Sequence, residues 1–345
     1  MSLRVPNHPL EWTQPQRVFI NDVDVLRRRT RVVGQPSEGG SCTLDCIIGE
    51  IRMSIQARES HTALYEETNF AARAEALDSL ESEVLARIEG LLLRDGNSEA
   101  LTGLKHHAET VRKRLEVVDE GLYRMLRQNI ASGDYTSTEL RRRIEAYAGA
   151  GSSGGSQEDE GYDSLDALVN GLLLGEGAPE APNLRHPEMV FYQPTPARIV
   201  LELVDRSDFR QHDVFYDLGS GLGQVSILVH LLSGVRAKGV EVEPAYCDYA
   251  RRCARGLNLS EVQFINADAR EANYSDGTVF FMYSPFEGRM LERVLERLRH
   301  ESEKRSIRLC TYGPCTQQVN RQSWLEPLDN NGNRADRLAM YRTLY

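Results

Sequence analysis

A glycine-rich segment in the second half of the chain has the residue types and spacing of a ligand-binding turn. Residues 214–216 have the β-branched and aromatic character of a strand, and an apolar helix is expected over 224–232. Between them, Gly219, Gly221 and Gly223 lack side chains where the backbone turns, so a ligand can approach closely. The first N–H groups of a helix are unpaired and attract carboxylates or phosphates. We therefore expect a binding site at this turn.

Polar residues follow the next three expected strands. Glu241 ends the strand-like run 237–241, at the distance after the turn where a carboxylate accepts hydrogen bonds from ribose hydroxyls. Strands expected at 262–265 and 278–282 lead into further polar or turn-forming segments. We expect the C-terminal ends of these four strands to meet at one edge of an α/β sheet. The residues that follow them predict a nucleoside-binding site there.

The order of these motifs resembles that of the class I S-adenosylmethionine-dependent methyltransferases. In chain order they are Asp217-Leu-Gly-Ser-Gly-Leu-Gly223, Gly239-Val-Glu241, Ala267-Asp268 and the segment from Tyr283 to Phe286. The resemblance covers about residues 186–345. Within the class, the chain is most similar to the non-SET histone lysine methyltransferases, although it has Tyr283-Ser-Pro-Phe286 where those enzymes have Asn-Asn-Phe.

The resemblance implies an α/β fold with a Rossmann-like, seven-stranded methyltransferase sheet at the C-terminus. A fifth strand is expected at 307–312, and the runs 324–328 and 338–342 match the terminal antiparallel hairpin of the family. Dinucleotide oxidoreductases share the strand, turn and acidic residue. They rank lower because their Gly-x-Gly-x-x-Gly fingerprint places the third glycine one position later.

The resemblance also implies which residues bind S-adenosylmethionine, whose product is S-adenosylhomocysteine. The glycine turn would hold the methionine part, Glu241 the ribose hydroxyls and Asp268 the adenine amino group. A segment before the first strand would pass over the cofactor. The expected cofactor-binding residues are Tyr192, Thr195, Asp217, Gly219, Ser220, Gly221, Gly223, Gln224, Glu241, Asp268 and Ala269.

Methyl transfer from a sulfonium is an in-line displacement, so the protein mainly positions donor and acceptor and excludes water. Tyr283, Ser284 and Phe286 are the candidate catalytic residues on the acceptor side, beside the methyl group. The segment also partly resembles the Asn/Asp/Ser-Pro-Pro-aromatic motif of amino-group methyltransferases. No residue stands out as a general base; His186, Tyr283 and Glu287 are the nearest candidates, and each also has a structural explanation.

The N-terminal part is predicted to be mainly α-helical. We divide the chain into a mixed segment 1–60, a helical domain 61–178 with a flexible loop at 149–161, and a methyltransferase domain 183–345. Within 1–60, strands are expected between 17 and 33, and 44–55 fits a strand or a helix. A helix is expected from Phe70 to Asp95.

The next helix carries a seam with alternating steps of three and four residues. Its members are Leu101, Leu104, Ala108, Val111, Leu115, Val118, Leu122 and Met125. The seam predicts a helical subdomain packed on itself, with homodimerisation or a substrate lid as alternatives. Ser164 is expected to cap a short helix ending at Leu174, whose apolar face must pack on another element or act as a lid.

The composition of the chain limits which binding partners and which cellular location we expect for the protein. Hydrophobic residues make up 41% of the chain and the net charge is −10, which disfavours non-specific binding to nucleic acid or anionic membranes. We find no signal-peptide or membrane-spanning pattern. The six cysteines form no Cys-x-x-Cys pair, which predicts a reducing cytoplasm and no bound metal.

The sequence thus predicts a methyltransferase that acts on a nitrogen or oxygen atom of a small-molecule acceptor. A protein lysine acceptor is the alternative that the family resemblance implies. A second alternative is a non-catalytic nucleoside-binding protein that uses its helical part for interactions.

Overall fold

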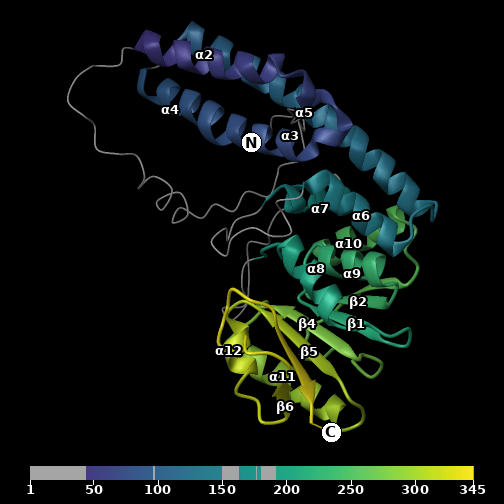
Figure 1. The fold of residues 1–345 in the computed structure, drawn as a ribbon. Coiled ribbons are helices and arrows are strands. Elements are labelled where there is room, and N and C mark those ends of the chain that lie inside the picture. Colours follow the sequence, from purple (N-terminus) through teal and green to yellow (C-terminus); the bar gives the residue numbers. More distant parts are fainter. Residues whose placement is uncertain (1–43, 96–97, 150–162, 176, 180–191, 345) are drawn as a thin grey trace, which may run out of the picture.

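The computed structural model describes residues 44–95, 98–149, 163–175, 177–179 and 192–344 (Figure 1). The strands are β1 (Val214–Leu218), β2 (Arg236–Glu241), β3 (Val262–Asn266), β4 (Val279–Tyr283), β5 (Arg308–Tyr312), β6 (Leu325–Pro327) and β7 (Ala339–Thr343). They form one seven-stranded sheet in the order β3-β2-β1-β4-β5-β7-β6. The first five strands are parallel, and β7 is antiparallel to β5 and β6. The predicted sheet and terminal hairpin are confirmed.

Two helical layers cover the sheet because its strands are apolar on both faces. One layer comprises α8 (Ala197–Arg206), α9 (Gln224–Ser233) and α10 (Pro244–Gly256), and the other α11 (Gly288–Ser302) and α12 (Cys315–Val319). Side chains alternate along each strand. Phe215 and Phe281 therefore pack under the first layer, whereas Tyr216 and Phe280 pack under the second.

The N-terminal part is helical, as predicted. Its elements are α2 (Leu44–Ser60), η2 (Thr62–Tyr65), η3 (Glu67–Asn69), α3 (Phe70–Ser79), η4 (Leu80–Leu85), α4 (Ala86–Asp95), α5 (Glu99–Ala131), α6 (Ser137–Ala148) and α7 (Ser164–Leu173). α3, η4 and α4 follow one another over 70–95, with a π-helical stretch at η4. α2, α4 and part of α5 form an arm that projects away from the sheet (Figure 1). The strands expected between 17 and 33 and nearly all of the loop 149–161 lie outside the described residues.

The buried face of α5 matches the predicted seam only in its first half. Leu101 to Leu115 lie in the core of the arm as expected. Beyond Leu115, Leu122 is buried as predicted, but Val118 and Met125 are only partly buried, and Asp119, Leu126 and Ile130 are buried as well. The seam prediction is therefore wrong for Val118 and Met125, because α5 leaves the arm there and packs on α7 and α3.

A buried ion pair lies where α5 changes its packing partner. Arg73 of α3 donates from Nε to Asp119 Oδ1 at 2.6 Å, and the two side chains are 0% and 7% exposed. Arg73 Nη1 also donates to the carbonyls of Leu64 and Glu66, at 3.0 and 2.7 Å. The pair thus joins α3, α5 and the short helices between α2 and α3.

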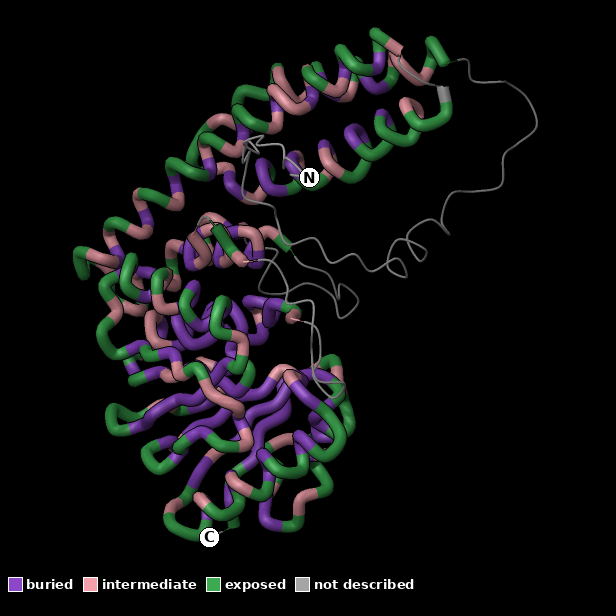
Figure 2. The backbone as a smooth tube through the Cα atoms, turned by 180° about the vertical axis from the view of Figure 1, so that it is seen from behind, coloured by how far each residue is buried: buried purple, intermediate pink, exposed green. Residues whose placement is uncertain are grey.

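α7 is a structural layer between the helical part and the sheet, so its interpretation as a lid is wrong. Its buried leucines pack in the core that also contains residues of α3, α5, α6, α8 and α9. In Figure 2 the helices above the sheet alternate between buried and exposed stretches, whereas the strands are mostly buried. The helix is capped by Asp163 rather than Ser164. Buried Asp166 accepts the backbone N–H of Ala197, the first residue of α8, at 2.6 Å. None of the described helices is long and apolar enough to span a bilayer.

We predict that Asp119→Ala destabilises the protein by about 3–5 kcal/mol, because it leaves the Arg73 guanidinium buried without its carboxylate. Urea unfolding monitored by circular dichroism measures the change. The control Glu89→Ala breaks the surface ion pair with Lys105 and should cost at most about 1 kcal/mol. Equal losses in the two variants would contradict the assigned role of the Arg73–Asp119 pair.

Candidate active site

The glycine turn between β1 and α9 is held against the end of β2. The backbone N–H groups of Gly219 and Ser220 both donate to the Val240 carbonyl, at 2.9 and 3.0 Å. Gly223 N donates to Ser220 O at 2.8 Å and closes the turn. Since β1, β2, β3 and β4 are parallel neighbours, their carboxyl ends meet at this edge, as predicted.

Each glycine of the turn is needed for two reasons. Gly219, Gly221 and Gly223 have φ angles of +82°, +51° and +88°, which disfavour residues with a Cβ atom. A Cβ atom on Gly219 would also lie 2.3 Å from Pro285, and one on Gly221 would lie 2.2 Å from the ring of Tyr192. The turn is therefore enclosed by one segment that precedes β1 and another that follows β4.

Glu241 at the end of β2 is bonded directly to this turn. Its Oε2 accepts the N–H of Gly221 and its Oε1 accepts the N–H of Glu243, both at 2.8 Å. The side chain is nearly buried, and desolvation raises its pKa. Each carboxylate oxygen has two lone pairs, so each can still accept a hydroxyl. The arrangement suits a ribose whose two hydroxyls bind next to the glycine turn.

Asp217, the fourth residue of β1, is a second buried carboxyl group beside Glu241. Burial, followed by repulsion from Glu241, raises the pKa of Asp217 to about 8. Two neighbouring buried carboxyl groups create a site that favours positive charge. S-adenosylmethionine carries a sulfonium and an ammonium group, so the residues present fit this cofactor.

Two side chains at the start of α9 also fit a polar ligand. Gln224 is 2% exposed, and neither its amide oxygen nor its amide nitrogen has a hydrogen-bond partner among the described residues. The buried hydroxyl of Ser220 likewise has none there. Buried polar groups are normally paired, so these atoms are candidates for ligand contacts.

The segment before α8 covers the glycine turn. Tyr192 lies against Gly221, and its ring packs on Tyr246 of α10 with the centroids 5.6 Å apart. Gln193 Oε1 accepts the hydroxyl of Tyr283 at 3.1 Å. Thr195 is buried. Residues 192–195 therefore extend from the glycine turn to the end of β4.

Asp268 and Ala269 follow β3 in a turn that has its own internal contacts. The Asp268 carboxylate pairs with Arg270, whose Nη2 lies 2.6 Å from Oδ2. The Ala269 carbonyl accepts the hydroxyl of Tyr274 at 2.6 Å. Gln193 and Pro285 belong to segments that the sequence placed at the site, although neither was named as a site residue, and sequence reasoning did not identify Arg270.

The three residues expected on the acceptor side occupy different environments. Tyr283 packs on Tyr312 with ring centroids 4.9 Å apart. Ser284 has an unusual φ of +38°, and its hydroxyl accepts Cys315 N at 2.9 Å and donates to Tyr312 O at 3.3 Å. Phe286 is buried in the core under α11. The half-buried Tyr283 and the buried Tyr312 therefore form an aromatic pair at the ends of β4 and β5.

The structure supports none of the described candidates as a general base. Burial, with a smaller effect of Tyr312, raises the pKa of Tyr283 to about 12, so its hydroxyl is neutral near pH 7. Glu287 is exposed, and His186 lies outside the described residues. The described residues contain no group of three or more His, Cys, Asp or Glu side chains placed to hold a metal ion.

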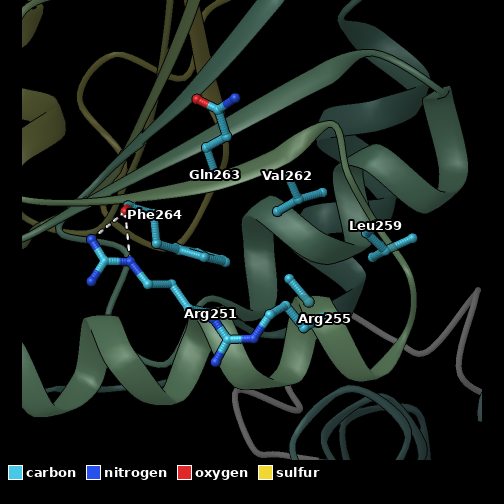
Figure 3. Close-up of a pocket in the computed structure, with 7 residues that line it drawn as sticks. Arg251, Arg255, Leu259, Val262, Gln263 and Phe264 are labelled. Atoms are coloured by element: carbon cyan, nitrogen blue, oxygen red, sulfur yellow. Dashed lines mark hydrogen bonds between the residues drawn. The ribbon is translucent and has the colours of Figure 1, made fainter.

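A separate pocket of about 360 Å³ lies at the outer edge of the sheet, between α10 and β3. Figure 3 shows Arg251 of α10 reaching to the edge strand, where its Nε and Nη2 donate to the Phe264 carbonyl at 3.1 and 2.8 Å. None of the predicted site residues lines this pocket. The Phe264 carbonyl lies on the open edge of β3. Because Arg251 already donates to it, this edge is less able to pair with another strand.

The strand order, the glycine turn after β1 and the carboxylate that ends β2 define a class I S-adenosylmethionine-dependent methyltransferase. Residues 187–282 match the family model described as "Histone methylation protein DOT1". The match contains β1, β2 and β3 and ends at Met282, just before the acceptor-side segment. No curated protein matches the chain.

Solved structures similar to the chain include methyltransferases with different acceptors. An RNA methyltransferase from Salinibacter ruber, in complex with S-adenosylhomocysteine, is 25% identical over 44% of this chain and 92% of its own, with a TM-score of 0.34. The geranyl diphosphate C-methyltransferase from Streptomyces coelicolor A3(2) is 14% identical over 43% and 75%, with a TM-score of 0.32. The fold itself is defined by the strand order β3-β2-β1-β4-β5-β7-β6.

When bound, S-adenosylmethionine supplies an activated methyl group on its sulfonium. The contribution of this chain is to bind and enclose the cofactor. We propose that the glycine turn, Glu241, Asp217 and Gln224 hold it, and that Tyr192 and Thr195 exclude water from one side.

We predict that Asp217→Asn stabilises the protein without cofactor, and that this stabilisation grows as the pH rises from about 4 to about 8. The fold raises the pKa of Asp217, so the stability that this neutral acid provides is lost as the pH rises toward about 8. An asparagine stays neutral at every pH. Melting temperatures from pH 4 to 9 measure the difference.

The control Asp276→Asn should show the opposite trend, because Lys238 and Tyr216 hold the pKa of Asp276 below its usual value despite burial. It should therefore lose stability mainly above pH 4. A constant difference between Asp217→Asn and the unmodified protein at all pH values would contradict the assignment.

We predict that Gly221→Ala lowers the affinity for S-adenosylhomocysteine at least about tenfold, since backbone strain and displacement of Tyr192 together cost more than about 1.4 kcal/mol. Calorimetric titration measures the affinity. Gly256→Ala is the control, because its new methyl group meets no atom within 4 Å. If both variants bind equally well, Tyr192 does not cover the cofactor turn.

Proposed function

We propose that this chain transfers a methyl group from S-adenosylmethionine to the nitrogen of a small-molecule amine. The observation that carries the proposal is the aromatic pair Tyr283–Tyr312 at the ends of β4 and β5. Pro285 contacts Gly219, so the segment that follows Tyr283 lies against the cofactor turn. Aromatic faces attract ammonium groups and also pack on neutral amines.

The amine must be neutral when it attacks the methyl group. Tyr283, with its pKa raised to about 12, does not accept a proton near pH 7. We therefore expect the acceptor to bind as the free amine, or to lose its proton to water before transfer. The rate of methyl transfer should then rise with pH and level off once the pH exceeds the pKa of the acceptor amine.

A protein lysine side chain is the second candidate, and the family match over 187–282 favours it. That match supports the cofactor half of the site, and it ends before Tyr283. The segment Tyr283-Ser-Pro-Phe286 replaces the Asn-Asn-Phe of the enzymes that the chain resembles, so we rank the small amine first.

A cytoplasmic location and a homodimer formed through the helical part stay predictions.

A direct test incubates the full chain with S-adenosylmethionine and two acceptor panels. One contains small primary and secondary amines, and the other contains histones and lysine-containing peptides. Mass spectrometry then detects the added methyl group. Methylation in the first panel alone supports the proposal, whereas methylation of lysine peptides alone replaces it with the second candidate. Tight cofactor binding without methylation of either panel favours a non-catalytic nucleoside-binding protein.

Once an acceptor is found, Tyr283→Ala should lower kcat/KM by about 3- to 30-fold, since it removes an aromatic contact worth about 0.5–2 kcal/mol. Tyr283→Phe keeps the ring and loses only the hydrogen bond to Gln193, so we expect a change within about tenfold. Affinity for S-adenosylhomocysteine should stay constant in both. A larger loss in Tyr283→Phe than in Tyr283→Ala would show that the hydroxyl, not the ring, matters.

A further inference from the structure

Arg198 is a half-buried arginine in the first turn of α8. Its guanidinium makes no hydrogen bond and no ion pair with any residue that the structure describes. The N-terminal end of a helix carries a partial positive charge, so a cation there is not stabilised by its own helix. Arg206 in the last turn has the favourable placement, and it pairs with Glu202 and Asp329. Helix stability therefore does not explain Arg198.

The side of α8 that carries Arg198 is turned toward the end of β5. Glu202 and Arg206 follow Arg198 at steps of four residues, so the three side chains lie along one side of the helix. Arg206 Nη1 donates to the carbonyl of Leu338 at 3.2 Å. Leu338 directly precedes β7, whose first residue pairs with the residue of β5 just before Tyr312. This side of α8 therefore reaches the strand ends that carry the aromatic pair.

A second contact brings the start of α8 to the end of β4. Gln193 Oε1 accepts the hydroxyl of Tyr283 at 3.1 Å, and Arg198 follows Gln193 by five positions. Burial raises the pKa of Tyr283 to about 12, and the positive charge of Arg198 opposes part of that rise. Among the described residues, no carboxylate acts on this hydroxyl. The acceptor side is therefore electropositive.

Asp166 of α7 is a carboxylate within the electrostatic reach of Arg198. Burial raises the pKa of Asp166 to about 6, and Arg198 opposes part of this rise. The two carboxylate oxygens accept the backbone N–H groups of Ala197 and Asp163, at 2.6 and 3.2 Å. No ion pair joins the described side chains of Asp166 and Arg198. The N–H donors of the guanidinium thus stay available to a ligand.

We propose that Arg198 binds a carboxylate of the methyl acceptor, so that the small amine is an amino acid. The inference rests on the proposed function, because it places the acceptor nitrogen beside Tyr283. The planar guanidinium matches a carboxylate in a two-point contact. A carboxylate carries one negative charge, which one arginine balances, whereas a phosphate monoester carries about 1.5 to 2. The same positive charge also favours the neutral amine that methyl transfer requires.

The test uses the full chain, S-adenosylmethionine and three probe acids with their methyl esters. The acids are glycine, β-alanine and γ-aminobutyrate, and each ester keeps the amine and the chain length but loses the negative charge. At least one acid should have a kcat/KM about tenfold or more above that of its ester. Arg198→Ala should lower kcat/KM for that acid by about 10- to 100-fold and change the value for the ester by less than about threefold.

Two further variants separate the contact from general charge. Arg198→Lys keeps the charge but loses the planar fork, so it should recover only part of the activity toward the acid. Arg236→Ala removes the same charge from an exposed residue at the opposite, amino end of β2, and it should leave kcat/KM unchanged. Equal losses for acid and ester in Arg198→Ala, or an equal loss in Arg236→Ala, would overturn the proposal.

Calorimetric titration of the three acids into the protein saturated with S-adenosylhomocysteine gives a readout that does not need methyl transfer. At least one acid should bind the unmodified protein, and Arg198→Ala should weaken that binding about tenfold or more at an unchanged melting temperature. No binding of any acid, or equal binding in the variant, would overturn the inference.

The two experiments also separate this inference from the proposed function. Binding of an acid through Arg198 without methylation of any amine would support the carboxylate site and contradict amine methylation. Methylation of uncharged amines that Arg198→Ala leaves unchanged, without binding of the acids, would support amine methylation and overturn the carboxylate site.

Discussion

The hydrogen bond from Gly221 to Glu241 is the contact on which the candidate active site depends. It joins the turn after β1 to the last residue of β2, and the same carboxylate fixes the start of α10 through Glu243. The glycine turn cannot shift without breaking this bond, because the adjoining N–H groups are held by Val240. Tyr192 and Pro285 enclose the turn only because it is held there. One carboxylate thus sets the shape of the nucleoside end of the site.

The fold of the C-terminal half was predictable because its signals are local. Short β-branched strands alternate with helices, and each turn residue acts within a few positions of its own strand. The seven-stranded sheet and its terminal antiparallel hairpin were expected from the family resemblance, and the structure agrees with both. Glu241 was also identifiable, since its place relative to the glycine turn follows from one strand, turn and helix. The orphaned amide of Gln224 adds an observation that residue type alone did not contain.

Other features depend on contacts between residues far apart in the sequence, which no local pattern reveals. The pairing of Arg73 with Asp119 spans 46 positions, and it ends the regular seam of α5 at a place where leucine-like spacing continues in the sequence. Gln193 and Tyr283 are 90 positions apart. The apolar face of α7 was expected to pack on another element or to act as a lid, because periodicity shows that one face is buried but not which element buries it.

The bond between Asp166 and Ala197 has a consequence for how this protein can evolve. α7 precedes the sheet in the chain, yet its carboxylate satisfies the first N–H of α8 and its leucines fill the core above α9. The catalytic half therefore lacks part of its own hydrophobic cover when α7 is absent. Exchange of the helical half for an unrelated domain would have to retain α7, so the unit of inheritance begins inside the helical region.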